Sequence, residues 1–212
     1  MPPSIALLGG TFDPIHFGHL RIALEIQQRW SFDEVRLMPC NQPGHRDQPL
    51  ASAAQRLDML RLATEDTPEL LVDDREIQRG GVSYMADTLA QLREEVGSQA
   101  SISLVLGMDS FVTLEFWSRW QAILDLANLL VVARPGNECL NNEFCERLVH
   151  ARSVDSAEAL LDAPQGRIFI QQLSLLDISA SRIRQLVKQG HSPRFLLPNA
   201  TLEYIHDHSL YQ

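Results

Sequence analysis

The chain has 212 residues, 45% of them apolar, and this length allows one large domain with a buried core. Its 27 acidic and 18 basic residues give a net charge of −9, which argues against binding of nucleic acid or of an anionic membrane surface. The N-terminus lacks a basic flank and no run of 18 apolar residues occurs, so we expect a soluble protein that is not exported.

The cysteines are Cys40, Cys139 and Cys145. Their number is odd and no two of them form a CxxC pair, so they favour neither a disulfide framework nor a zinc site. We therefore expect a reducing, cytoplasmic setting.

The first elements in the chain are typical of a βαβ unit. Residues 5–8 are an apolar run that closes on Gly9 and Gly10, as expected of a buried strand. Residues 18–30 carry their apolar side chains on one face, which predicts an amphipathic helix, and residues 34–39 predict a second strand that ends at a proline. The helical crossover between two buried strands predicts that they pair in parallel.

The same alternation continues to the end of the chain. We expect helices over 53–64, 84–96 (capped by Ser83), 118–127, 141–151, 156–161, 180–189 and 199–206, and strands over 70–74, 102–107, 128–134 and 167–172. This pattern predicts an α/β fold with one doubly wound parallel sheet. Residues 1–212 would form a single domain, with 177–212 as a small helical C-terminal subregion.

Residues 9–19, GGTFDPIHFGH, join the first strand to the first helix. Ligands of open parallel sheets bind beyond the carboxyl ends of the strands, where Gly9 and Gly10 allow backbone amides to approach closely. The helix start adds free N–H groups and the positive end of the helix dipole. His16 and His19 are three residues apart and face the same side, and a histidine held protonated beside phosphate donates hydrogen bonds. The stretch therefore predicts a phosphate site.

Other sites of this general kind gain less support from the sequence. The GxGxxG pattern of dehydrogenases and the GK[ST] pattern of P-loops are both absent. Paired histidines also occur in metal sites, but HxxH without a nearby glutamate on the same helix face is a weak metal signal.

GTFDPIHFGH resembles the HxGH signature of the nucleotidyltransferases related to class I aminoacyl-tRNA synthetases. From the first strand to LLPNATLEYIHDHSLY, the whole chain is similar to the bacterial nicotinate mononucleotide adenylyltransferase family. The signature is specific for the superfamily and less so for the phosphate acceptor.

This resemblance implies a Rossmann-like nucleotidyltransferase fold and a role in NAD biosynthesis. ATP and nicotinate mononucleotide would be the substrates, and deamido-NAD and pyrophosphate the products. Mg²⁺ would be held through the ATP phosphates, because the motifs contain no carboxylate cluster to cage it. No nucleic-acid or membrane partner is expected, and the protein would be a monomer or a small homo-oligomer.

Residues 177–184, DISASRIR, resemble the second signature of the family. Ser179 and Ser181 would offer hydroxyls and amides to phosphate oxygens, and Arg184 would hold the β- and γ-phosphates. Taken without the resemblance, this stretch is equally typical of a capped helix start with surface arginines. The catalytic residues implied are His19, which donates to an α-phosphate oxygen, His16, which helps to fix the triphosphate, and Arg184.

The nucleotide would also contact the segment GMDS, which directly follows a predicted strand. The resemblance implies that Gly107 and Asp109 bind the adenosine ribose, although Asp109 also suits a helix N-cap. The ATP-binding residues implied are Gly9, Gly10, Thr11, Phe12, Gly18, Gly107, Asp109, Arg134, Ser179 and Ser181.

The resemblance implies that three further segments bind the phosphate acceptor. In RGGVSYMADTL, backbone amides at Tyr84 and Met85 would receive the nicotinate carboxylate, and Met85 stands where the family commonly has threonine. Trp117 matches the tryptophan that stacks on the pyridine ring, whereas Trp120 is expected in the core. In PCNQPGHR, Gly44 replaces a proline of the family pattern. The acceptor-binding residues implied are Cys40, Asn41, His45, Arg46, Ser83, Tyr84, Met85 and Trp117.

Four alternatives stay open from the sequence. Pantetheine-phosphate adenylyltransferases usually carry threonine in place of His16 and have shorter chains, and cytidylyltransferases have a different second signature. Nicotinamide mononucleotide differs from the nicotinate acceptor only in the charge that its ring presents. A non-catalytic nucleotide sensor would keep ATP binding without turnover, and the presence of His16, His19 and Arg184 argues against it.

Overall fold

The computed structural model describes residues 2–44, 48–133, 142–174 and 176–212. Within these residues the chain forms a six-stranded sheet in the order β4-β2-β1-β6-β7-β8, and every neighbouring pair is parallel. The order starts at β1 in the middle and runs outward in both directions, which is the doubly wound arrangement that the sequence predicted. The strands are β1 (Ser4–Gly10), β2 (Glu34–Pro39), β4 (Leu70–Val72), β6 (Ser101–Gly107), β7 (Asn128–Ala133) and β8 (Ile168–Gln172).

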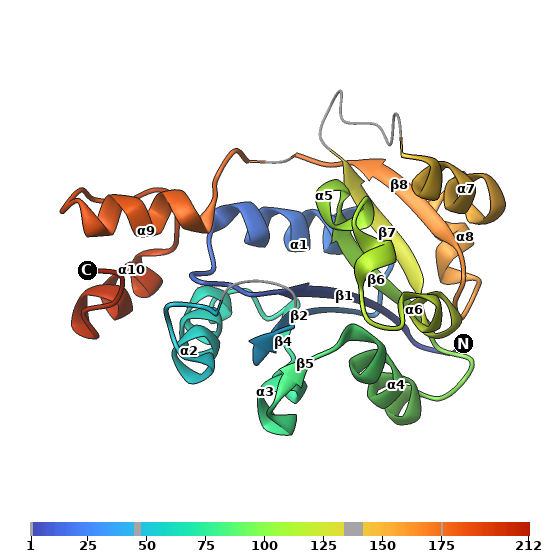
Figure 1. Ribbon diagram of the computed structural model, residues 1–212, viewed down its shortest axis with the longest axis horizontal. Coiled ribbons are helices and arrows are strands. Elements are labelled where there is room, and N and C mark those ends of the chain that lie inside the picture. Colours follow the sequence, from blue (N-terminus) through green and yellow to red (C-terminus); the bar gives the residue numbers. More distant parts are fainter. Residues whose placement is uncertain (1, 45–47, 134–141, 175) are drawn as a thin grey trace.

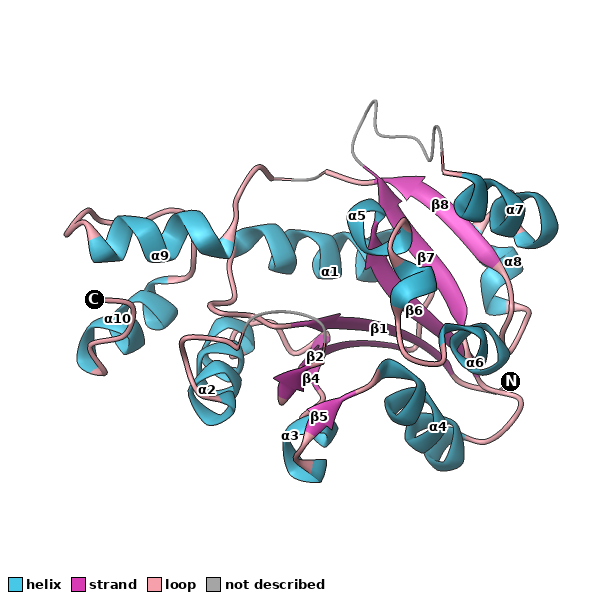
Figure 2. Ribbon diagram, in the orientation of Figure 1, coloured by secondary structure: helices cyan, strands magenta, loops and turns pink. Residues whose placement is uncertain are grey.

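Helices cover both faces of this sheet, as Figure 2 shows. Each of the predicted helices is present among the described residues, with ends shifted by one or two residues in most cases. The helices are α1 (Phe17–Arg29), α2 (Ala53–Thr64), α3 (Arg75–Arg79), α4 (Met85–Val96), α5 (Met108–Phe111), the 3-10 helix η1 (Leu114–Phe116), α6 (Trp120–Leu126), α7 (Glu143–Arg152), α8 (Ala157–Leu161), α9 (Ala180–Lys188) and α10 (Asn199–Asp207).

Two details of the predicted elements are wrong, and each has a local cause. Ser83 does not cap α4, because Tyr84 holds the N-cap position and the Ser83 hydroxyl accepts a hydrogen bond from the backbone of Asn41 at 2.9 Å. The strand predicted over 70–74 ends at Val72, since the carboxylate of Asp73 bonds the backbone and guanidinium of Arg75 at the start of α3.

The structure also adds short elements that the sequence patterns did not predict. These are α3, α5, η1 and a second sheet, in which β3 (Gln42–Pro43) pairs in parallel with β5 (Val82–Ser83). Elements of two to five residues are too short to carry a hydrophobic period, so periodicity cannot detect them. They lie between the long elements and shape the edge of the sheet where the strands end.

The core lies in two layers, one on each face of the sheet. Along β1 the side chains of Ile5 and Leu7 pack against α4 and α6, whereas Ala6 and Leu8 pack against α1, α2 and α8. All four are buried. A strand that is buried on both faces appears in the sequence as a continuous apolar run, which is why residues 5–8 gave such a clear signal.

The last two helices lie beyond the end of the sheet and close one side of the molecule (Figure 1). Helix α10 packs on α2, where the Tyr204 hydroxyl donates to Asp58 at 3.1 Å and the Thr201 hydroxyl donates to the carbonyl of Met59 at 3.5 Å. None of the described helices has the length and apolar character that crossing a membrane requires.

Candidate functional site

A cavity of about 1160 Å³ opens where β1 and β6 end. These two strands are neighbours in the sheet, and the direction of chain winding reverses between them. Crevices at such switch points are the usual ligand sites of doubly wound folds. The cavity is therefore where the fold alone would place a nucleotide, and its volume is large for a single drug-sized ligand.

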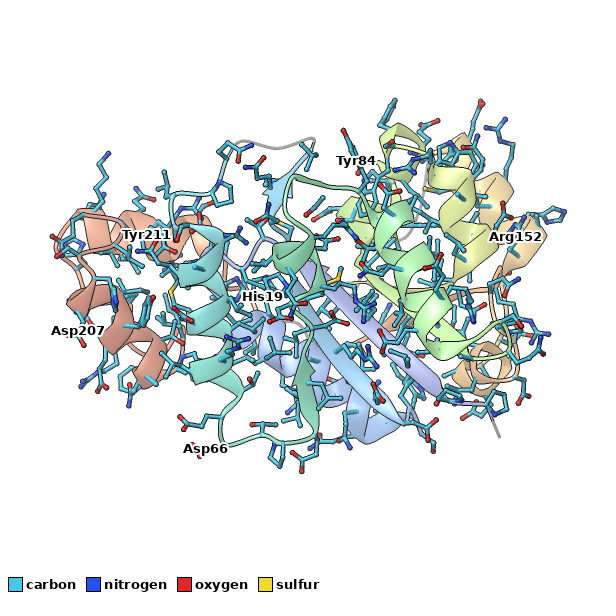
Figure 3. All side chains as sticks on the ribbon, turned by 90° about the horizontal axis from the view of Figure 1, so that it is seen from below. His19, Asp66, Tyr84, Arg152, Asp207 and Tyr211 are labelled. Atoms are coloured by element: carbon cyan, nitrogen blue, oxygen red, sulfur yellow. The ribbon has the colours of Figure 1, made fainter. Side chains whose placement is uncertain are left out.

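Two stacked imidazole rings form the base of this cavity. His16 is the N-cap residue of α1 and His19 lies in its first turn, so the helix start fixes both side chains. Their ring centroids are 3.8 Å apart with an angle of 22° between planes, and the Phe12 ring meets His19 edge-on at 5.0 Å. A Cβ atom on Gly18 would approach the His16 ring to 2.9 Å, so only glycine permits this stack. Figure 3 shows His19 near the middle of the molecule.

Burial keeps both imidazoles uncharged near neutral pH. The Nδ1 atoms of His16 and His19 are buried without a hydrogen-bond partner in the described structure. Burial lowers the pKa of His16 from 6.5 to about 4. Burial, followed by the neighbouring His16, lowers the pKa of His19 well below its usual range. A neutral ring still donates one N–H, and protonation of a histidine beside a bound phosphate stays a prediction.

The helix start offers fewer free amides than the sequence predicted. The backbone N–H of Phe17 donates to the carbonyl of Leu196 at 3.0 Å, and that of His19 donates to the carbonyl of His16 at 3.0 Å. The segment before α10 thus occupies a donor that was expected to face an anion. Side-chain donors must carry more of any phosphate binding than the helix dipole argument implied.

The second signature lies beside the loop that carries the histidines, at the start of α9, and also lines the cavity. The Ser179 hydroxyl caps this helix by accepting from the Arg182 backbone at 3.3 Å, as expected for a capped start. Arg184 Nη1 donates to the carbonyl oxygen of Asp13 at 2.6 Å, and Nη2 donates to the Ser181 hydroxyl at 3.4 Å. These bonds leave donors of a partly exposed guanidinium at the cavity wall.

The end of β6 supplies the open side of the cavity. Gly107 is the N-cap residue of α5, and a Cβ atom there would meet nothing within 4 Å. Asp109 lies exposed in the first turn of α5, so the alternative prediction that it caps this helix is wrong. Its carboxylate is at the cavity wall, where it could accept hydrogen bonds from a diol.

A second group of side chains surrounds the start of α4. Tyr84 is the N-cap residue of this helix and is 40% exposed. Arg119 lies over the Tyr84 ring at 5.7 Å and forms a two-point ion pair with Asp87 in the first turn of α4, with both distances 2.6 Å. Trp117, between η1 and α6, is half-buried and lines the same part of the cavity. Trp120, which was expected in the core, is only partly buried and packs against the core edge-on to Phe144 at 4.9 Å.

The loop after β2 contributes Cys40 to the cavity wall but not Asn41. The Asn41 backbone N–H donates to Ser83, and its side-chain amide donates to the carbonyl of Gly81 at 2.8 Å, so this residue joins two loops. Burial raises the pKa of the Cys40 thiol, which keeps it protonated. The predicted residues His45, Arg46 and Arg134 lie outside the described residues.

Most of the residues singled out from the sequence thus meet at one cavity. The family resemblance implied that the two signatures act together, and the rule that parallel strands end at one edge of the sheet predicted that the segments after the strands would meet. The cavity wall includes Gly9, Gly10, Thr11, Phe12, His16, Gly18, His19, Cys40, Ser83, Tyr84, Met85, Gly107, Asp109, Trp117, Ser179, Ser181 and Arg184.

Sequence reasoning did not single out the residues that brace this wall, namely Asp13, Arg56 and Glu76. Arg56 is 1% exposed, and its guanidinium donates to the carbonyls of Thr11 and Asn41, each at 2.7 Å. A signal was available, because an arginine three residues before Met59 lies on the buried face of the predicted helix. Glu76, 2% exposed at the cavity wall, accepts from the Thr88 hydroxyl.

The described residues contain no group of three or more His, Cys, Asp or Glu side chains arranged to hold a metal ion.

The chain matches known sequences over most or all of its length. A family model described as cytidylyltransferase-like matches residues 7–186. A protein of Cellvibrio japonicus named "Probable nicotinate-nucleotide adenylyltransferase" is 47% identical over 212 residues, which cover 100% of both chains. A protein of Hahella chejuensis with the same name is 46% identical over 213 residues, covering 98% of this chain and 95% of the relative.

Solved structures support the fold. The nicotinic acid mononucleotide adenylyltransferase of Plasmodium falciparum complexed with NaAD superposes with a TM-score of 0.75 at 17% identity, covering 99% of this chain and 97% of that one. The same protein complexed with APC superposes with a TM-score of 0.71 at 16% identity and the same coverage. At this level of identity the likeness bears on the fold alone.

Proposed function

The chain belongs to the cytidylyltransferase-like family and, within it, to the nicotinate-nucleotide adenylyltransferases, and we propose from this membership that it transfers the adenylyl group of ATP to nicotinate mononucleotide. The products are deamido-NAD and pyrophosphate, and the reaction belongs to NAD biosynthesis. The observation that carries this proposal is that the stacked His16 and His19 line the same cavity as Arg184, at the switch point of the sheet.

The reaction needs positioned charge more than a nucleophilic side chain. A 5′-phosphate oxygen of the mononucleotide attacks the α-phosphorus of ATP, a new P–O bond forms, and the bond to the β-phosphate oxygen breaks with its electron pair leaving on pyrophosphate. Both substrates already carry the reacting atoms, so the protein contributes alignment and stabilisation of developing charge.

The residues on the triphosphate side have distinct roles in this proposal. His19 would donate a hydrogen bond to an α-phosphate oxygen, and His16 would help to hold the triphosphate. Arg184 would stabilise the departing pyrophosphate, for which a planar guanidinium with several N–H donors is suited. The arriving phosphates would raise the pKa of both imidazoles, because the negative charge favours their protonated forms.

Two further groups would hold the rest of the substrates. Asp109, beside Gly107, would accept hydrogen bonds from the ATP ribose. Trp117 would stack on the pyridine ring, and the amides at the start of α4 would receive its carboxylate. The Arg119 charge next to this position is neutralised by Asp87, so the helix start rather than a free cation would distinguish nicotinate from nicotinamide.

Mg²⁺ fits this site as a companion of ATP, because the described residues offer no cage of their own and the substrates bring the phosphate oxygens that it prefers. When bound, it would neutralise charge on the phosphates. We expect a chelator to abolish turnover and added Mg²⁺ to restore it, measured as pyrophosphate release. Turnover that persists in excess chelator would contradict this part of the proposal.

The acceptor is tested by a pyrophosphate-release assay with ATP, Mg²⁺ and a panel of nicotinate mononucleotide, nicotinamide mononucleotide and pantetheine phosphate. The highest kcat/KM is expected with nicotinate mononucleotide. A higher kcat/KM with another compound of the panel would identify that compound as the acceptor instead. ATP binding without product from any of the three would indicate a nucleotide sensor.

The cytoplasmic setting and the oligomeric state also belong to this proposal. A cytoplasmic setting is supported by Cys40, a free thiol in the described structure. A monomer or a small homo-oligomer is proposed, and light scattering on the purified protein measures its mass in solution.

A further inference from the structure

Asp13 is a buried carboxylate in the loop between β1 and α1, three residues before His16. Its side chain is almost fully enclosed, with the residue 5% exposed. Oδ1 accepts from the Ala51 backbone at 3.1 Å, and Oδ2 accepts from the Leu50 backbone at 2.9 Å. The backbone carbonyl of Asp13 is the oxygen to which Arg184 donates. This one residue therefore joins the loop that carries the imidazole pair to the arginine of α9.

The remaining donor to this carboxylate comes from a residue 198 positions away. The hydroxyl of Tyr211 donates to Asp13 Oδ1 at 2.7 Å, the shortest of the three bonds to that carboxylate. Tyr211 is 8% exposed, and burial together with this hydrogen bond raises its pKa, so the hydroxyl keeps its proton. Figure 3 shows Tyr211 at the side of the molecule where α10 ends.

The backbone around Tyr211 supports a specific role for this contact. Tyr211 has φ of 64° and Ser209 has φ of 50°, both in the left-handed region that side chains other than glycine rarely adopt. Such conformations cost free energy and persist where surrounding contacts determine them. Here the left-handed turns after α10 bring the tyrosine hydroxyl to Asp13.

The hydrogen bonds to Asp13 also decide how strongly it attracts Arg184. Arg184 Nη1 lies 3.8 Å from Asp13 Oδ2, longer than the 2.7 to 2.9 Å that is typical of a charge-assisted bond. Three donors already satisfy the carboxylate and disperse its charge, so the guanidinium is not drawn into a close pair. The N–H groups of Arg184 that do not bond Asp13 or Ser181 stay available at the cavity wall.

We propose that Tyr211 is a positioning residue for the triphosphate: by donating to Asp13 it holds the phosphate-binding loop and keeps Arg184 free to bind the β- and γ-phosphates. This inference rests on the proposed function. Without the hydroxyl, Asp13 carries more unsatisfied negative charge, Arg184 closes onto it, and both ATP and pyrophosphate lose a binding group. Among the described residues, the donors to the Asp13 carboxylate are Leu50, Ala51 and Tyr211, and none of them is assigned to the acceptor.

Tyr211→Phe tests the proposal, with Tyr204→Phe as its matched control. Both substitutions remove one hydroxyl that donates to an aspartate, and both lie in the same terminal segment, but Tyr204 bonds Asp58 on the outer side of α2. The KM values for ATP and for nicotinate mononucleotide are measured separately, and the Kd for ATP is measured by calorimetry.

We expect Tyr211→Phe to raise the KM and Kd for ATP about tenfold, the loss typical of one hydrogen bond to a charged group, and to leave the KM for the mononucleotide unchanged. Tyr204→Phe should change neither constant. A Tyr211→Phe protein that binds ATP as the wild type does, or whose two KM values change equally, would overturn the proposal. Partial unfolding would raise the two KM values together, so an increase confined to ATP identifies loss of positioning rather than loss of folded protein.

A double substitution separates action through Asp13 from a packing effect. In an Asp13→Asn background, Tyr211→Phe should weaken ATP binding by less than twofold, because the charge that it controls is already gone. A full tenfold effect in that background would show that Tyr211 affects ATP binding by a route other than the Asp13 charge. An inactive wild type would refute adenylyl transfer, whereas the ATP Kd values would still decide the role of Tyr211.

Discussion

At the scale of single residues, burial lowers the pKa of both stacked rings, His16 and His19, so that neither is charged near neutral pH. Their geometry follows from one helix start and one glycine that leaves room for the stack. Their protonation state follows from burial, which a sequence pattern does not report. The sequence predicted that the two imidazoles would lie on the same side of the helix start, but it did not predict their charge.

His19→Ala tests the donor to the α-phosphate. A contact that strengthens mainly in the transition state affects kcat more than ground-state binding. We expect kcat to fall by roughly two to three orders of magnitude, as for removal of one transition-state donor, while calorimetry still detects ATP binding. Near-normal turnover in this variant would contradict the role of His19.

His16 should make the protein less stable in acid. Its pKa is about 4 in the folded chain and 6.5 in the unfolded chain, so the unfolded state binds more protons between these values. The free energy of unfolding therefore falls as the pH drops from 6.5 to 4, by about 3 kcal/mol from this residue. Urea unfolding across this range measures the slope.

The matched variants for that measurement are His16→Gln and His206→Gln. The first removes the buried imidazole and should flatten the fall in stability between pH 6.5 and 4. The second replaces an exposed histidine on α10 and should leave the slope as it is in the wild type. Equal slopes in all three proteins would mean that His16 is not the buried neutral group.

At the scale of elements, the long helices and strands could be predicted because their hydrophobic patterns are long. Helix α2 has the bounds predicted for it, Ala53–Thr64, since Ser52 and Gln55 form a capping box at its start. The contact between Phe17 and Leu196 could not be predicted, because nothing in either segment encodes its distant partner. The same holds for Asp13 and Tyr211.

The short element η1 sets the position of Trp117 on the acceptor side. Trp117→Ala should raise the KM for nicotinate mononucleotide roughly tenfold and leave the KM for ATP unchanged, as expected for loss of base stacking. Phe116→Ala is the control, because this neighbouring aromatic side chain is 78% exposed and lies outside the cavity wall. If the KM for ATP alone moved, the stacking role of Trp117 would be wrong.

Arg56 connects α2 to the loops around the cavity. Arg56→Met leaves the buried carbonyls of Thr11, Asn41 and Ala51 without their donor, so the free energy of unfolding should fall by about 3 kcal/mol or more. Arg61→Met on the same helix removes only an exposed ion pair with Asp74, and should cost less than about 1 kcal/mol. Equal losses in chemical denaturation would contradict this account of Arg56.

At the scale of the whole molecule, the parallel sheet explains why residues far apart in the chain share one cavity. Residues after β1, β2 and β6 meet because all three strands end at the same edge. The segment after β8 then covers this edge from the side and contributes Arg184 from α9 and Tyr211 from the turn after α10. We propose that residues 1–212 work as one domain, since the site needs both its first loop and its last turn.

The central claim is that this cavity joins two nucleotides, and the most direct measurement is the product balance of the purified chain. With ATP, nicotinate mononucleotide and Mg²⁺, mass spectrometry should detect one deamido-NAD and one pyrophosphate for each ATP consumed. Consumption of ATP to ADP or AMP without a dinucleotide, or no consumption at all, would contradict the account.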